Sequence, residues 1–189
     1  MPRIEQSFEV PRSDEVVWRF FEDVPRVAEC MPGVELEDET GAGTYRGRMK
    51  LKLGPLNASF QGEASVSHDD SNPRSASINA KGVDRKGGSR ASAKVRYEVA
   101  PVSAGSRVAI TADITLQGAM AQFGRTGLIQ EVSAQLTKEF AACLEQKLAA
   151  ETPEAAAEVR SRELGGLSLL VRGVWSWLGR VLRRRNVGR

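Results

Sequence analysis

The spacing of apolar residues changes once along this chain, near Gly118, and that change restricts the possible folds more than any other feature. Between residues 34 and 116, apolar and polar residues alternate over short stretches, as in half-buried strands. After Gly118 the apolar residues recur every three or four positions, which is the spacing of one helix face. This stripe contains Ile129, Val132, Leu136, Phe140 and Cys143. The sequence therefore predicts a sheet followed by one long amphipathic helix, from about Ala119 to Glu151.

Turn signals divide the strand-like region into separate strands. Short segments such as ETGAG, HDDSNP and DRKGG interrupt the alternation and predict five or six antiparallel strands. Residues 3–10 alternate as a further strand, Ser13 is placed to cap a short helix, and a second short helix is expected near Pro25. Helices on one face of an antiparallel sheet give an α+β fold. The sheet has to curve around the long helix to bury the helix's apolar stripe.

Small residues stand at many positions that alternation assigns to the inside of the sheet, among them Ala58, Gly62, Ala80 and Ala93. Protein interiors are close-packed, so either the long helix packs tightly here or another molecule fills the space. Tight helix packing, or a reversed phase of some strands, is the alternative to a ligand cavity. We expect an apolar cavity lined by Tyr45, Met49, Phe60, Ala93, Tyr97, Phe123, Leu128, Val132 and Leu136.

The sequence contains no pattern that points to catalysis. The single histidine, His68, lies in a polar turn, where solvation explains it better than catalysis. Cys143 falls on the helix stripe as a core residue, and Cys30 ends the second short helix. Their wide separation suggests neither a disulfide framework nor a thiolate metal site, and fits a reducing cytoplasm. We expect a protein that is not an enzyme and that has no metal site and no covalently bound cofactor.

Positive charge is concentrated at the end of the chain. The net charge is +3, but residues 165–189 contain six arginines and no acidic residue, so the remainder carries −3. This distribution does not favour nucleic acid binding. On a helix, the apolar residues of this segment face away from most arginines, so we expect it to lie in an anionic membrane surface. Docking in a groove of a partner, or on its own domain, is the alternative. The predicted membrane contacts are Leu167, Leu170, Val171, Arg172, Val174, Trp175, Leu178, Val181 and Leu182.

Composition divides the chain into three parts. Residues 1–150 form the predicted ligand-binding domain, 151–165 a polar linker, and 166–189 the basic amphipathic helix. The first residues lack the apolar run of a signal peptide, and the terminal helix is too short and too charged to span a bilayer. We therefore expect a cytoplasmic protein, peripheral on the inner face of the cell membrane.

Three segments, taken together, carry a family resemblance. They are VWRFFEDVPRVAECMPGVE, GRMKLKLGPLNASFQGEASV and ADITLQGAMAQFGRTGLIQEVSAQLTKEFAACLEQKL. Over about residues 2–150 the chain resembles the carbon monoxide dehydrogenase CoxG family of the helix-grip, START-like (SRPBCC) superfamily. The resemblance implies a curved antiparallel sheet gripping the C-terminal helix, with the two short helices closing a cavity. It also implies an association with molybdenum-containing carbon monoxide dehydrogenases, a link to their membrane recruitment, and no molybdenum, iron–sulfur or flavin centre in this chain.

These observations lead to one main functional hypothesis and two alternatives. In the main hypothesis, the cavity carries a lipophilic small molecule, an isoprenoid respiratory quinone such as menaquinone, between the membrane electron-transport chain and the dehydrogenase. A pure membrane anchor or assembly factor would need the terminal helix but not the cavity. An enzyme, such as the cyclases and aromatases of this superfamily, would need converging acid–base groups.

Overall fold

The computed structural model describes residues 3–53, 56–125, 127–150 and 159–160 of the 189-residue chain. The predicted membrane-binding helix and almost all of the predicted linker lie outside the described residues. Among the helices that are described, none is long and apolar enough to cross a membrane.

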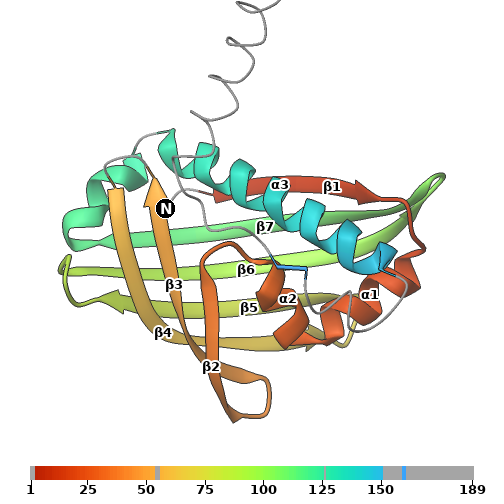
Figure 1. Cartoon of the computed structure of the whole chain (residues 1–189), viewed down its shortest axis with the longest axis horizontal. Coiled ribbons are helices and arrows are strands. Elements are labelled where there is room, and N and C mark those ends of the chain that lie inside the picture. The colour runs from red at the N-terminus through yellow and green to blue at the C-terminus, as the bar shows by residue number, and fades with distance from the viewer. Residues whose placement is uncertain (1–2, 54–55, 126, 151–158, 161–189) are drawn as a thin grey trace, which may run out of the picture.

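One antiparallel sheet of seven strands forms most of the molecule (Figure 1). Strands β2 to β7 pair in chain order, and β1 pairs with β7, so β1 and β2 are the two edges. This arrangement confirms the α+β helix-grip fold expected from the sequence. In chain order the strands are β1 (Arg3–Val10), β2 (Val34–Gly41), β3 (Thr44–Leu53), β4 (Leu56–Asp69), β5 (Asn72–Asp84), β6 (Ser89–Val102) and β7 (Gly105–Gln117).

Two short helices, α1 (Asp14–Glu22) and α2 (Val24–Cys30), connect β1 to β2. The hydroxyl of Ser13 accepts a hydrogen bond from the Val16 backbone N–H, 3.4 Å away, so Ser13 caps α1 as expected. Four residues of α1, including Val17 and Phe20, are buried against the inner face of the sheet. The inner face is here the face on which α1 and the C-terminal helix pack.

The C-terminal helix begins later than its apolar spacing predicts. Residues 118–125 form a 3₁₀ helix, η1 (Gly118–Arg125), and the α-helix proper is α3 (Leu128–Ala149). Gly118 has a φ of 73°, and a side chain there would overlap the carbonyl oxygen of Gly88. The Met120 N–H also donates to the Ser89 hydroxyl, 3.2 Å away. Contacts with the β5–β6 turn therefore set the path of this segment, which local periodicity does not reveal.

Buried apolar residues form three separate clusters on the inner face. The largest joins α1, α3 and the ends of β6 and β7, and includes Phe20, Tyr97 and Phe140. A second surrounds Ile129, and a third contains Phe60 and Met120. The inner face is thus well packed at its two ends, and its middle lies between these clusters.

The expectation that Cys30 and Cys143 stay unpaired is wrong. The two side chains form a disulfide that joins α2 to α3, with the two Cα atoms 5.4 Å apart. Both residues are buried, and the bridge links positions 113 residues apart. A neighbouring ion pair between Lys147 Nζ and Glu29 Oε2, 2.6 Å long, connects the same two helices. Separation in sequence does not report separation in space, and the bridge removes the cysteine-based argument for a reducing compartment.

Candidate functional site

A row of small residues crosses the middle of the inner face. The register places Tyr45 opposite Ala64, Ala64 opposite Ala80, and Ala80 opposite Ala93. The next row, towards the β5–β6 turn, contains Gly47, Gly62, Gly82 and Ala91 in the same cross-strand order. Because these positions carry little or no side chain, the centre of the inner face is shallow between rims of larger residues.

The apolar side chains around this row keep partial contact with solvent. Those that are half-buried and belong to none of the three clusters in the described part of the chain form what we call the inner apolar surface. Core residues usually touch many neighbours and lose all exposure, so this surface is apolar area that the fold itself leaves partly uncovered. It consists of Tyr45, Met49, Ala64, Val66, Ala80, Ala93, Val132 and Leu136.

The position of α3 explains why this surface stays partly open. The helix packs mainly along β1, with further contacts to α2 and η1 (Figure 1). Ile129 and Phe140 near its two ends are buried, whereas Val132 and Leu136, on the same helix face, are only half-buried. The middle of α3 therefore faces the sheet without closing against β3, β4 and β5.

The residues predicted from sequence to line a cavity fall into two groups. Tyr45, Met49, Ala93, Val132 and Leu136 come together on the inner apolar surface. The structure places the others elsewhere: Phe60 and Tyr97 in the buried clusters, Leu128 half-buried at the start of α3, and Phe123 in η1, where its side chain lies outside the described residues. Enclosure of the surface into a tunnel, and ligand contact at these residues, stay predictions.

Sequence reasoning missed one member of the surface. Val66, which the predicted lining omitted, lies opposite Ile78 on the row next to the alanines. The alternation that selects Ala64 also selects Val66, two positions further along the same strand. The signal was therefore present in the sequence, but the polar turn that follows at His68 made the inner phase difficult to extend.

The two tyrosines mark two sides of the inner apolar surface. Tyr97 is buried with its ring centroid 4.8 Å from Phe21 and 6.2 Å from Trp18, and burial raises the pKa of Tyr97 to about 12. Partial burial, followed by the nearby carboxylates of Glu39 and Asp23, also raises the pKa of Tyr45. Both phenols therefore stay neutral near pH 7 and add no charge to this region.

Titratable groups are sparse around the inner apolar surface. His68 is exposed at the end of β4, with its ring centroid 5.8 Å from Trp18 at one end of the inner face. Within the described ranges, no three His, Cys, Asp or Glu side chains gather in a way that could hold a metal ion. What the surface offers to another molecule is hydrophobic contact, together with the phenol of Tyr45 as a polar group.

Solved structures with the same fold come from several bacteria. A conserved protein from Geobacillus kaustophilus is 18% identical, with a TM-score of 0.67, over 77% of this chain and 93% of that one. A STAR-related lipid transfer protein from Xanthomonas axonopodis is 16% identical, with a TM-score of 0.54, over 75% and 85%. The Zhui aromatase/cyclase from Streptomyces sp. R1128 is 14% identical, with a TM-score of 0.51, over 79% and 96%. At these identities the likeness shows the fold alone.

Sequence comparison adds the family. No curated protein matches the chain. The family model for CoxG, described as a carbon monoxide dehydrogenase component, matches residues 7–149, which contain all seven strands except the start of β1, and all of α1, α2, η1 and α3. The match confirms the resemblance seen in the three sequence segments, and it covers the whole inner apolar surface. The chain therefore belongs to the carbon monoxide dehydrogenase CoxG family.

Proposed function

We propose that this protein binds a lipophilic small molecule on the inner apolar surface and acts as a carrier rather than as an enzyme. The observation that supports the proposal is the half-exposed apolar area between the sheet and α3, centred on Ala64, Ala80 and Ala93. A ligand that covers this area would gain roughly 25 cal/mol for each Å² of apolar surface removed from water. A structural neighbour named as a lipid transfer protein has the same fold, which agrees with this use.

An isoprenoid quinone is the ligand we propose, menaquinone being one example. Its prenyl units would cover the row of alanines, and its headgroup carbonyls could accept a hydrogen bond from the neutral phenol of Tyr45. Membership of a dehydrogenase-associated family supports a redox-active ligand over a structural lipid. In this proposal the protein delivers the quinone between the membrane electron-transport chain and a molybdenum-containing carbon monoxide dehydrogenase.

The test is the content of a lipid extract of the purified full-length protein. We expect mass spectrometry to find a respiratory quinone in amounts that increase with the amount of protein. A matched extract of an unrelated soluble protein, purified from the same cells, controls for lipid carry-over. An extract free of quinone, from a protein that also fails to take up added quinone, would favour the alternative function: a membrane anchor or assembly factor without a ligand.

We further propose that residues 166–189 hold the protein on the inner face of the cytoplasmic membrane. Burial of one aliphatic side chain is worth roughly 1.5–3 kcal/mol, and each basic residue near an anionic leaflet contributes about 1 kcal/mol. Even with shallow insertion, six apolar side chains and five arginines between residues 165 and 185 exceed the cost of ordering one helix. Trp175 and Trp177 suit the interface, because an indole combines an apolar ring with a hydrated N–H.

Sedimentation with phosphatidylglycerol-containing vesicles tests this placement. The full-length protein is expected to pellet with the vesicles, and the pelleted fraction should fall as salt rises because salt screens the arginines. A chain ending at Glu163 should stay in the supernatant and keep its quinone. The full-length double variant Val174→Asp with Leu178→Asp should behave like the shortened chain, since it places charge on the apolar stripe. Equal pelleting of all three proteins would show that the terminal segment is not the anchor.

A further inference from the structure

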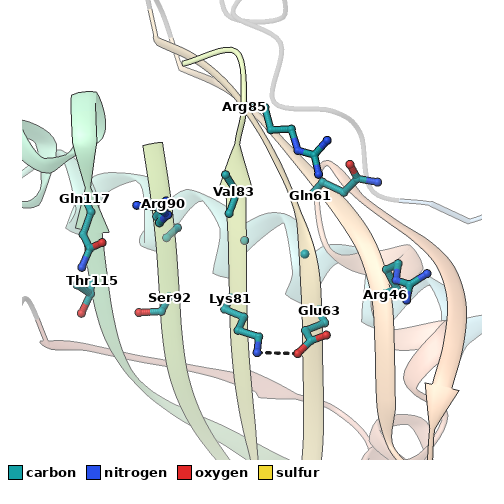
Figure 2. A pocket seen from close by; sticks show the side chains of 13 residues that line it. Arg46, Gln61, Glu63, Lys81, Val83, Arg85, Arg90, Ser92, Thr115 and Gln117 are labelled. Atoms are coloured by element: carbon teal, nitrogen blue, oxygen red, sulfur yellow. Dashed lines mark ion pairs between the residues drawn. The ribbon is translucent and has the colours of Figure 1, made fainter. Parts of the chain in front are cut away.

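A polar depression of about 630 Å³ lies on the outer face of the sheet, opposite the face that α3 covers (Figure 2). Strands β3 to β7 and the turn between β5 and β6 contribute to it. In Figure 2 the labelled side chains stand on the near side of the sheet and the helix ribbon passes behind it. We call this depression the outer groove. Its polar lining includes Gln61, Ser92, Thr115 and Gln117.

Positive charge dominates the outer groove. Four cationic side chains line it, against one carboxylate, Glu63. Glu63 is already occupied, because its Oε1 lies 2.8 Å from Lys81 Nζ. Among the residues that the structure describes, no carboxylate lies within ion-pair distance of Arg85 or Arg90. These two guanidinium groups flank Val83, whose residue is 40% exposed (Figure 2). The four cations are Arg46, Lys81, Arg85 and Arg90.

The floor of the outer groove is also the centre of the inner face. Gly62, Gly82 and Ala91 line the groove, yet the register assigns them to the inner row next to the alanines. A side chain at Gly62 would overlap the carbonyl oxygen of Lys81 on the next strand, so the close approach of the two strands here depends on glycine. At this point the two faces are separated by little more than backbone.

We propose that the outer groove docks an acidic segment of the partner dehydrogenase. Planar guanidinium groups bind carboxylates with two parallel hydrogen bonds, and Arg85 and Arg90 have that capacity available. The amide and hydroxyl side chains can hydrogen-bond a peptide backbone, and exposed Val83 supplies an apolar contact between the two arginines. The proposal rests on the proposed function, because it identifies the surface through which the carrier meets its dehydrogenase.

A protein segment fits this site better than a lipid surface does. The outer groove is recessed and carries hydrogen-bonding side chains on several strands, whereas a bilayer presents a broad surface that a recess does not match. The proposed membrane helix is also a separate part of the chain, and it leaves the groove available. A segment docked in the groove would lie one sheet thickness from a quinone on the inner apolar surface.

The test measures binding of the full-length protein to a purified molybdenum-containing carbon monoxide dehydrogenase from the same organism, at two salt concentrations. The groove variant is Arg85→Glu with Arg90→Glu. The control, Arg12→Glu with Lys94→Glu, changes two exposed cations outside the groove by the same charge. A third variant, Ser92→Trp, fills the groove without changing its charge. Circular dichroism, quinone content and vesicle sedimentation are measured on every protein.

We expect the groove variant to bind the dehydrogenase at least about tenfold more weakly, the control to stay within about twofold, and Ser92→Trp to weaken binding as well. Quinone content and vesicle sedimentation should not change. Equal losses in groove and control variants, or normal binding by a folded groove variant, would overturn the docking site and leave the carrier function in place. Loss of vesicle binding in the groove variant alone would assign the groove to lipid instead. Absence of dehydrogenase binding by the unmodified protein would overturn the proposed partner, and the docking site with it.

Discussion

Replacement of both half-cystines, Cys30→Ala with Cys143→Ala, is expected to lower the free energy of unfolding by about 2–5 kcal/mol. The disulfide connects residues 113 positions apart, so its loss frees a large part of the unfolded chain from a covalent constraint. It also ties α2 to α3 within the largest buried cluster. The α2 end of the inner face should therefore open more readily in the variant.

Urea denaturation without reductant measures this effect, and the unmodified protein with reductant is the matched control. Reduction removes the same covalent link while both sulfur atoms stay in place, so it separates the link from the loss of side-chain volume. The reduced protein and the double variant should both unfold at clearly lower urea than the oxidised protein. Identical midpoints for the oxidised and reduced protein would show that the cross-link does not stabilise the fold.

Ala93→Trp is expected to weaken quinone binding by about thirtyfold or more, on the basis that an occupied site cannot accept a ligand in the same volume. Ala93 stands between Ala80 and Ile114 in the row that crosses the inner face. It is half-buried, so an indole there can extend over the inner apolar surface instead of being forced into a filled core. The ring would cover the area that we assign to the prenyl chain.

The quinone content of lipid extracts, measured by mass spectrometry, is the readout, because the new indole complicates fluorescence. Lys94→Trp is the control: it places the same side chain on the next residue of β6, which is exposed on the outer face. The control should keep normal quinone content, and both variants should keep the melting temperature within a few degrees. Unchanged quinone content in Ala93→Trp would show that the ligand does not bind against the central row.

The identity and order of the elements could be predicted from the sequence, because each depends on residues a few positions apart. Alternation placed Ala80 and Ala93 on one face, and the hydroxyl of Ser13 marked the start of α1. The same local reasoning failed at the start of the C-terminal helix, where the distant Ser89 holds η1 in a different path. It also failed at Cys30, whose partner is 113 residues away.

Only the tertiary structure decided which faces are covered and which residues meet. The apolar stripe of α3 predicts that the helix is buried against the sheet, but not that it packs mainly along β1 and leaves Val132 and Leu136 half-exposed. The outer groove is a further example, because Arg46 and Arg90 come from strands that meet only through the register of β4 and β5 between them. Local periodicity depends on backbone geometry over a few residues, whereas these arrangements depend on register, sheet curvature and packing between residues far apart in the chain.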